Sequence, residues 1–373
     1  MTQDRRSFGP TGRPRGRGLG LPFAGDTGPA NALTDVPGVA VGFRTLVRGE
    51  GRLQPGQGPV RTGVTAILPR GGTKEYLPVW AGMFALNGNG EMTGGHWIED
   101  AGHWHGPLLI TNTHSVGMAH HAAVGWMVRH YPAIALNGLW AMPVVAETFD
   151  GHLNDVNGRH VTEADVLAAI ESAAPGPLAE GNVGGGTGMI AYEFKGGTGT
   201  ASRRLALPQG NYTVGALVQA NFGIRPWLTI LGVPVGQHLT ADRLWSRETG
   251  SVIGIVGTDA PLLPNQLKRL AKRIGLGIGR TGTPSGNNSG DIFLAFSTAN
   301  ATPFAPGTAL PGLAYLPDEA LDPLYLGLVE AVEEAVVNAL LAAETMTGRD
   351  GNIVRALDHD ALLAVMRRHG RLG

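Results

Sequence analysis

The sequence contains no cysteine, and this single absence excludes several kinds of chemistry. Without thiols the chain can form no disulfide bond, no thiolate metal site and no cysteine nucleophile. Excess charge is also missing, since the formal net charge is -1 at pH 7. That balance favours neither nucleic acid nor an anionic membrane surface as a partner.

Long apolar runs are missing as well. The best candidate for a membrane span, residues 324–343, is interrupted by Glu330, Glu333 and Glu334. Residues 1–20 are polar and rich in arginine, and they lack the apolar h-region of a secretory signal. We therefore expect a cytoplasmic protein with no membrane and no nucleic-acid partner.

Glycine, in contrast, is abundant, with 58 glycines among 373 residues, about twice the average usage of roughly 7%. The apolar fraction of 43% and the charged fraction of 16% are those of a globular protein. Glycines cluster at 184–186 and 196–197, where they would permit tight loops and close backbone approach. Loose surface loops are the alternative interpretation of these clusters.

The order of predicted elements indicates the fold class. Several strands follow one another directly, which favours a layered α+β domain over a regular parallel doubly wound sheet. Residues 10–17 are of low complexity and are expected to form a mobile arm or a segment lying along an edge. Strands are predicted at 64–68, 108–111, 144–147, 214–219, 228–231, 252–256 and 292–297. Helices are predicted at 116–130, 162–173, 260–277, 321–344 and 359–369.

The familiar hydrolase motifs are absent from the sequence. No serine lies in a complete G-x-S-x-G elbow, and Ser115 comes nearest but lacks the first glycine. S-x-x-K and H-E-x-x-H are not found, and residues 181–188 have the glycines of a phosphate loop without its lysine. Histidines gather between positions 96 and 121, but no carboxylate completes a familiar metal-ligand spacing. Packing or capping roles are therefore favoured, and no metal or cofactor is expected.

One serine occupies a different setting. Ser251 directly follows Gly250 and begins the apolar run 252–256. If the bond between them is strained, the Ser251 hydroxyl can attack the Gly250 carbonyl, and hydrolysis of the resulting ester leaves Ser251 with a free α-amine. That amine has an ordinary pKa near 7.7–8.0, so it can act as the base for its own hydroxyl. The dipeptide by itself is more typical of a turn leading into a strand.

A resemblance to a known family changes the weight of this dipeptide. The sequence resembles the DmpA and β-peptidyl aminopeptidase family of self-processing serine aminopeptidases over nearly its whole length. Besides Gly250-Ser251, the motifs are NALTDVPGV at 31–39, LNGNGEMTG at 86–94, ITNTHSVG at 110–117, VVAETFDG at 144–151, GNVGGGTGM at 181–189, VQANFG at 218–223, TDAPLL at 258–263 and SGNNSGDIF at 285–293.

The resemblance implies a fold, a maturation and an assembly. The expected fold is an αββα sandwich that looks like the N-terminal-nucleophile hydrolases but has a different connectivity. The family's precursor cuts itself, which here would divide a single domain of residues 1–373 into an α chain, 1–250, and a β chain, 251–373. The family usually assembles as a homotetramer of such αβ pairs.

The resemblance also implies roles for individual residues. Ser251 matches the nucleophile and the new β-chain N-terminus, released from Gly250. Ser289 and Asp291 match the serine and the acidic residue that orient and polarise the hydroxyl and amine of the nucleophile. The family acid can be glutamate or aspartate, and because aspartate is shorter, how far the Asp291 carboxylate reaches stays open. Asn221 matches an amide that stabilises the oxyanion. Glu147 matches the carboxylate that receives the free ammonium group of the substrate.

Phe149 departs from the family pattern, which commonly has tyrosine at this position. The ring is kept and the hydroxyl donor is lost, so Phe149 is interpreted as a substrate-binding residue without an acid–base role. The main prediction is an aminopeptidase that acts on short peptides, amides or esters of L-, D-Ala or β-amino acids through an acyl-Ser251 intermediate. The alternative is a catalytically impaired relative that serves as a small-molecule binder or scaffold.

Overall fold

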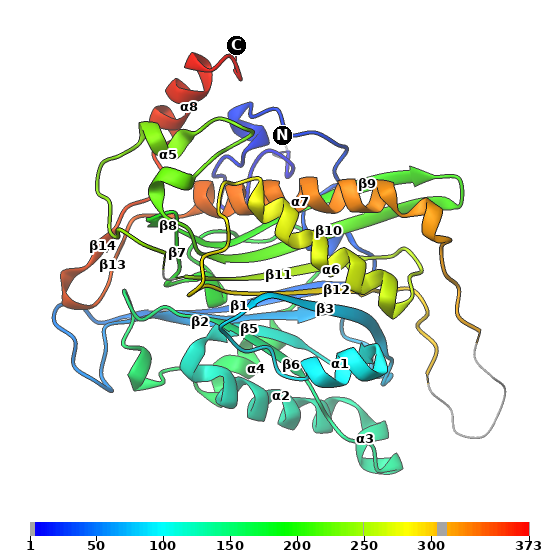
Figure 1. The fold of residues 1–373 in the computed structure, drawn as a ribbon. Helices are drawn as coiled ribbons and strands as arrows, with labels where there is room; N and C mark the ends of the chain where they lie inside the picture. Colours follow the sequence, from blue (N-terminus) through cyan, green and yellow to red (C-terminus); the bar gives the residue numbers. More distant parts are fainter. Residues whose placement is uncertain (1–3, 249, 304–311, 373) are drawn as a thin grey trace.

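The structure is a computed structural model that describes residues 4–248, 250–303 and 312–372. Figure 1 shows four layers: helices, a larger sheet, a smaller sheet, and helices again. The predicted α+β class and αββα sandwich are therefore confirmed. In the described part of the chain, no helix combines the length and the apolar character that crossing a membrane requires.

The larger sheet has six strands in the order β4-β3-β12-β11-β10-β9. Only β11 and β12 run parallel, and the other neighbours are antiparallel. In chain order the strands are β3 (Val79–Gly88), β4 (His103–Trp104), β9 (Gly197–Leu207), β10 (Gly210–Asn221), β11 (Ser251–Thr258) and β12 (Gly290–Ser297). The centre of this sheet therefore combines strands that lie far apart in the sequence.

The smaller sheet has four strands in the order β1-β2-β5-β6, of which β5 and β6 run parallel. Its strands are β1 (Ala40–Arg48), β2 (Val60–Leu68), β5 (Leu108–Asn112) and β6 (Val144–Thr148). Two short hairpins lie outside the main sheets. They are formed by β7 (Ile190–Ala191) with β8 (Phe194–Lys195) and by β13 (Met346–Thr347) with β14 (Ile353–Val354).

Helices cover the outer faces of both sheets (Figure 1). The larger sheet is covered by α6 (Pro264–Gly279) and α7 (Asp322–Ala342), and the smaller sheet by α2 (Val116–His130) and α4 (Glu163–Glu171). The remaining helices are α1 (Gly95–Ala101), α3 (Pro132–Asn137), α5 (Val235–His238) and α8 (His359–Arg368). The predicted capping box of α4 is present, with Thr162 and Asp165 each satisfying a backbone N–H of the other.

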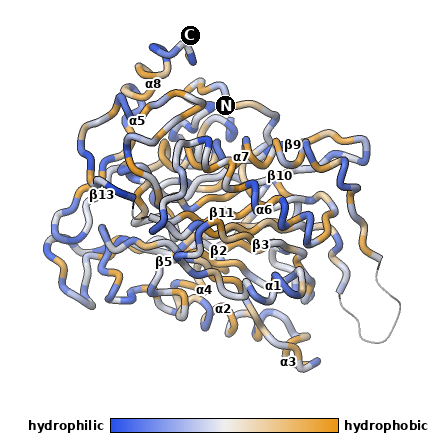
Figure 2. Tube along the Cα trace, viewed as in Figure 1, coloured by the Kyte–Doolittle hydropathy of each residue, from blue (hydrophilic) through white to orange (hydrophobic). Residues whose placement is uncertain are grey.

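The strand β11 shows why the middle of the molecule is apolar on both sides. Val252 and Val256 belong to the core between the larger sheet and α6 and α7. Ile253 and Ile255 belong to the core between the two sheets. A strand buried on both faces is a continuous apolar run rather than an alternating one, and Figure 2 shows the hydrophobic colour concentrated along these central strands.

Two buried glycines allow parts of the backbone to approach closely. A Cβ added to Gly199 of β9 would overlap the carbonyl oxygen of Ala335, so α7 lies directly against the sheet. Gly184 has a φ of 54° and is buried against Thr65 and Phe43. The glycine cluster at 184–186 is thus a tight, buried turn and not a loose surface loop.

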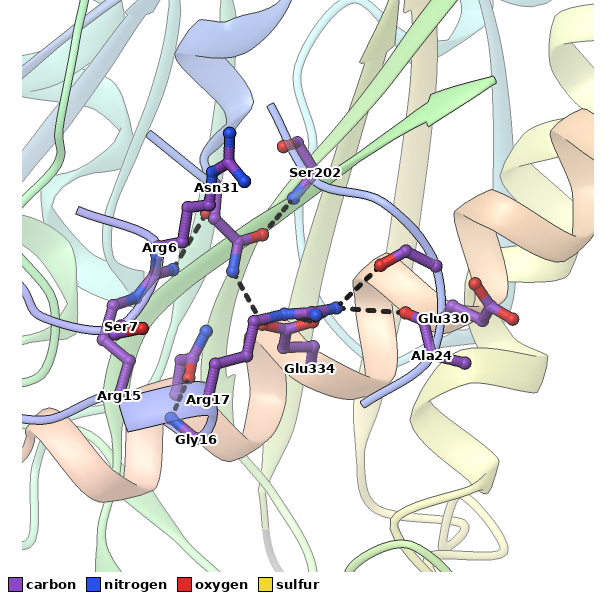
Figure 3. A network of polar contacts seen from close by, with 12 residues as sticks. Arg6, Ser7, Arg15, Gly16, Arg17, Ala24, Asn31, Ser202, Glu330 and Glu334 are labelled. Carbon is purple, nitrogen blue, oxygen red and sulfur yellow. Dashed lines mark hydrogen bonds and ion pairs between the residues drawn. The ribbon is translucent and has the colours of Figure 1, made fainter. Parts of the chain in front are cut away.

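The N-terminal segment is held by ion pairs with the helix α7 (Figure 3). Arg17 lies 3.0 Å and Arg203 of β9 lies 2.8 Å from the carboxylate of Glu334, and Asn31 donates a hydrogen bond to the same carboxylate at 2.6 Å. Arg15 is buried and forms an ion pair with Glu180. Residues 15–17 contact α7 and the edge strand β9, which fits the expectation of a segment lying along an edge.

Replacing Glu334 with alanine is expected to lower the free energy of unfolding by about 3–5 kcal/mol, because the buried Arg203 would lose the closer and fully buried of its two carboxylate partners. The free energy can be measured by urea denaturation. Glu330→Ala is the matched control, since Glu330 lies one turn earlier, is more exposed and is 3.4 Å from Arg203. Equal losses in the two variants would contradict the role of Glu334 as the centre of this network.

One predicted strand is wrong. Residues 228–231 follow a 3-10 turn, Arg225–Trp227, and bend back through paired hydrogen bonds between Ile230 and Val233. Leu231 has a φ of 51°, which a strand cannot accommodate. The apolar composition of 228–231 reflects burial of a turn, because Leu228 and Ile230 are fully buried.

Candidate active site

Ser251 is the first residue of β11, at the centre of the larger sheet. It pairs with Asn221 at the end of β10 on one side and with Gly290 at the start of β12 on the other. The Ser251 side chain is only 6% exposed, and its Oγ has no hydrogen-bond partner among the described residues. The sheet therefore presents a buried hydroxyl at the edge where β10 ends and β11 and β12 begin.

Gly250 lies against β10 so closely that no other residue fits. A Cβ at this position would overlap the carbonyl oxygen of Asn221 and crowd the Cα of Phe222. The Gly250 carbonyl accepts a hydrogen bond from the N–H of Gly290 at 3.3 Å. The peptide bond before Ser251 is thus held between two strands; Thr249, the preceding residue of the predicted cleavage segment, lies outside the described residues.

Ser289 and Asp291 lie at the start of the neighbouring strand β12. The Ser289 hydroxyl donates to Asp291 Oδ1 at 2.6 Å, and the Ser285 hydroxyl donates to the other carboxylate oxygen. Asp291 pairs in register with Val252, the residue after Ser251. Burial raises the pKa of Asp291, while the two serine hydrogen bonds oppose that rise. The structure therefore brings the predicted pair together and adds Ser285, whose contact no sequence motif had indicated.

Glu248 is a second carboxylate that the sequence reasoning missed. It is buried three residues before Ser251 and accepts hydrogen bonds from the N–H of Gly223 at 2.6 Å and of Gly286 at 2.7 Å. Burial raises the pKa of Glu248. Its carboxylate ties the segment before Ser251 to the end of β10 and to the loop that precedes Ser289.

The Asn221 side chain is held at both of its ends. Its Oδ1 accepts a hydrogen bond from the N–H of Ile190 at 2.9 Å, and its Nδ2 donates to the carbonyl of Phe149 at 3.0 Å. Because an amide has distinct donor and acceptor ends, these two partners define which end is the NH₂ group. The NH₂ group of Asn221 is therefore held next to Ser251, the residue that pairs with Asn221 between β10 and β11.

Glu147 comes from the other sheet, near the end of β6. Its carboxylate accepts hydrogen bonds from the N–H of Glu91 at 3.1 Å and from the hydroxyl of Thr113. The side chain is buried, and burial raises the pKa of Glu147. Both of these donors are neutral groups, so this buried carboxylate retains its capacity to attract a cation.

Two cavities meet at Gly250 and Phe149. A cavity of about 650 Å³ is lined by Glu147 and Ser251 together with these two residues. A second cavity of about 350 Å³ is lined by Asn221 and again by Phe149 and Gly250. The predicted nucleophile and the predicted ammonium-binding carboxylate therefore open into one cavity, and the predicted oxyanion amide borders the next.

Phe149 forms the wall between the two cavities. Its side chain is 50% exposed, and its ring packs so closely over Gly151 that a Cβ there would overlap the ring. The ring supplies an apolar surface and no hydrogen-bond donor. This position supports the interpretation of Phe149 as a pocket residue and offers it no acid–base role.

Two of the histidines that gather in the sequence lie in a different place, whereas His114 follows Thr113 and lies near the Glu147 carboxylate. His103 and His105 line an aromatic cavity of about 510 Å³ together with Tyr76, Trp97 and Trp140. The Tyr76 and His105 rings stack at 4.2 Å, and burial lowers the pKa of His105 to about 3. Within the described ranges no group of three or more acidic, histidine or cysteine side chains is arranged to hold a metal ion.

Comparisons with known proteins agree with this geometry. The model of peptidase family S58 matches residues 31–354. Beta-peptidyl aminopeptidase BapA of Sphingosinicella microcystinivorans is 50% identical over 374 aligned residues, which cover 96% of this chain and 93% of that protein. BapA of Sphingosinicella xenopeptidilytica is 45% identical, with 95% of this chain and 91% of that protein covered.

Solved structures show the same similarity. The L-aminopeptidase D-Ala-esterase/amidase of Ochrobactrum anthropi, a prototype for the serine aminopeptidases and a variant of the Ntn hydrolase fold, superposes with a TM-score of 0.92 at 56% identity. The match covers 97% of this chain and 100% of that one. The β-aminopeptidase of a Burkholderia species superposes with a TM-score of 0.87 at 45% identity, covering 95% and 99% of the two chains. The sandwich described above is thus this variant of the Ntn hydrolase fold.

Proposed function

Because the chain belongs to peptidase family S58 and is a hydrolase of the serine aminopeptidase type, we propose that it cuts itself between Gly250 and Ser251. The freed Ser251 then removes N-terminal residues from short peptides, amides or esters. The observation that carries the proposal is that Ser251 lines the same cavity as Glu147 and that its buried hydroxyl has no hydrogen-bond partner among the described residues. This cavity supplies a nucleophile and a cation-binding group for one small substrate.

Self-cleavage would proceed through an amide-to-ester shift. The Ser251 Oγ attacks the Gly250 carbonyl carbon, the hydroxyl proton passes to the departing Ser251 nitrogen, and the amide bond breaks. Water then hydrolyses the ester, which restores the Ser251 hydroxyl and leaves a carboxylate on Gly250. The hold on Gly250 by β10 and by the Gly290 N–H supports this step, because it keeps the carbonyl beside the hydroxyl.

Turnover would use the new α-amine of Ser251 as the base. The amine takes the hydroxyl proton as Oγ attacks the substrate carbonyl, and the proton then passes to the leaving amine or alcohol. Asn221 would donate to the tetrahedral oxyanion, since its NH₂ end is fixed beside Ser251. Ser289, held by Asp291, would orient the Ser251 hydroxyl and amine from the adjacent strand. Water releases the acyl group and regenerates the hydroxyl.

Glu147 would select substrates with a free amine. Glu147→Gln should lower kcat/KM for alanine p-nitroanilide roughly 100-fold, mainly through KM, because the buried carboxylate that pairs with the substrate ammonium loses its charge. Self-cleavage should persist in this variant, since the precursor presents no free amine at Gly250. Steady-state kinetics and a denaturing gel check the two halves of this expectation. An unchanged KM in the cleaved variant would show that the ammonium-binding role is wrong.

The proposal is tested by analysing the purified protein on a denaturing gel and sequencing its fragments. Two fragments are expected, residues 1–250 and 251–373, the second beginning Ser-Val-Ile-Gly. Any other new N-terminus would exclude Ser251 as the nucleophile. Amides of L-Ala, D-Ala and β-homoalanine would then define the substrate class. Gel filtration would test assembly as a homotetramer of αβ pairs.

Phe149 supports a second candidate function, that of a catalytically impaired relative which binds small molecules. The half-exposed ring stands at the junction of both cavities and carries no hydroxyl donor. In that case the protein would bind a substrate amide without hydrolysing it. Release of p-nitroaniline from the alanine substrate discriminates between the two functions directly.

A further inference from the structure

A lysine is buried beside the candidate active site, and within the described part of the chain its hydrogen-bond partners include no carboxylate. Lys195, at the end of β8, is fully buried, and its Nζ donates to three backbone carbonyls. These are Met189 at 2.8 Å, Gly196 at 2.9 Å and Gly186 at 3.4 Å. Burial lowers the pKa of Lys195 to about 7. Burying an ammonium group in this way is costly, so its position calls for a purpose other than filling the core.

The Met189 carbonyl connects Lys195 to Asn221. The peptide unit that carries this carbonyl also carries the N–H of Ile190, and that N–H donates to Asn221 Oδ1 at 2.9 Å. A donor on the carbonyl side of a peptide polarises its N–H, so consecutive hydrogen bonds strengthen one another. Lys195, one peptide unit and the Asn221 amide therefore form a single hydrogen-bonded chain.

This chain determines which way the Asn221 amide faces. The Ile190 N–H occupies the oxygen end, and the Nδ2 end donates to the Phe149 carbonyl at 3.0 Å. An amide NH₂ has two donors, so one N–H remains for a carbonyl under attack at Ser251, its strand partner. If the Met189–Ile190 peptide shifted or rotated, the amide would lose the partner that sets this orientation.

The turn around Lys195 leaves it little freedom to move. A Cβ at Gly186 would overlap the backbone N–H of Thr198, and a Cβ at Gly196 would crowd the carbonyl of Ala220 and the backbone of Ala191. The Gly196 N–H donates to the same Met189 carbonyl at 3.0 Å. The Met189 carbonyl thus accepts from two donors, the Gly196 N–H and the Lys195 Nζ.

We propose that Lys195 is a positioning residue for acyl transfer to Ser251, which acts through the Met189–Ile190 peptide to hold the Asn221 amide with its NH₂ group toward the attacked carbonyl. The inference rests on the proposed function and deepens it. The same amide would face the Gly250 carbonyl during self-cleavage and the substrate carbonyl during turnover. Lys195 should therefore affect both reactions.

A double-mutant cycle tests this connection. Lys195→Met, Asn221→Ala and the double variant are compared by the rate of self-cleavage during cell-free synthesis and by kcat and KM for alanine p-nitroanilide. Lys195→Met should lower the self-cleavage rate and kcat roughly 10- to 100-fold and change KM by less than about 2-fold, because an oxyanion donor acts mainly in the transition state. With Asn221 already replaced, the same change should cost less than about 3-fold in the self-cleavage rate.

Lys268→Met is the matched control, since Lys268 is 42% exposed and pairs with Glu99 at the surface; it should alter neither rate. The proposal would be overturned if Lys195→Met lowered the self-cleavage rate by the same factor with and without the Asn221 side chain. It would also be overturned if Lys195→Met changed only KM. Lys195→Gln is the second variant, and failure of both to fold by circular dichroism would also overturn it, because the lysine would then serve the fold. If the unaltered protein neither cleaves itself nor hydrolyses the amide, the proposed function fails instead.

Discussion

Replacing Ser251 with alanine is expected to leave one uncut chain of 373 residues and to abolish peptidase activity. The variant removes the only group that the proposed mechanism uses to attack both Gly250 and the substrate. Losing a covalent nucleophile costs on the order of 10⁴-fold or more in rate. Intact-mass measurement after prolonged incubation checks the cleavage, and p-nitroaniline release checks the activity.

Ser246→Ala is the control for this experiment. Ser246 is exposed and lies in the same segment before β11, so its removal changes a nearby hydroxyl without touching the sheet. This variant should mature and turn over substrate as the unaltered protein does. Fragments of normal size from the Ser251 variant, or an uncut Ser246 variant, would contradict the assignment of the attacking hydroxyl.

Asp291→Asn is expected to lower kcat roughly 100-fold or more. The carboxylate accepts from both Ser285 and Ser289, whereas an amide has one accepting end and would release one of the two hydroxyls. Burial raises the pKa of Asp291. As the pH is lowered, the fall in kcat caused by protonation of Asp291 should therefore begin at a higher pH than it would for an aspartate with an ordinary pKa. The sign follows from the charge: as the pH drops through the raised pKa, the carboxylate is protonated and can no longer accept from both serines.

The kcat profile between about pH 4 and pH 8 measures this effect, and it separates Asp291 from Glu147, whose loss should appear mainly in KM. The Asn variant should lose the part of the acidic limb in kcat that Asp291 causes and keep the part that protonation of the Ser251 α-amine causes. Asp318→Asn is the control, because Asp318 is exposed and its pKa is lowered by hydrogen bonds to Gln266 and Arg269. An unchanged acidic limb in the Asp291 variant would show that another group titrates.

The long helices were predictable because their signal lies within one segment. Residues 116–130 form α2 with the predicted bounds, and 359–369 differ from α8 by one residue. The strand β9 was not predicted, since most of its sequence GTGTASRRLAL is glycine, polar or charged and it has no long apolar run. The contacts that explain these residues are made with distant parts of the chain. Gly199 allows α7 to pack closely against β9, and Arg203 forms an ion pair with Glu334. Such contacts leave no periodic pattern.

Some residues of the candidate site could likewise be predicted from the sequence, and others could not. Ser251, Asn221 and Glu147 could be named from motifs, and the structure gathers them around adjoining cavities. Glu248 and Lys195 could not be named, because a single charged residue in a polar segment is ordinarily a solvated one. Their importance depends on burial and on backbone partners supplied by distant loops, and only the folded chain reveals these.

The position of β11 has a thermodynamic consequence. A cut before Ser251 would divide the larger sheet between two chains, with β3, β4, β9 and β10 on one and β11 and β12 on the other. Unfolding would then release two molecules instead of one, so the melting temperature would depend on protein concentration. The covalent link would no longer supply the high effective concentration that guides re-pairing. Persistence of the mature form at high dilution would therefore depend on slow separation of interlocked strands, a kinetic protection and not an equilibrium one.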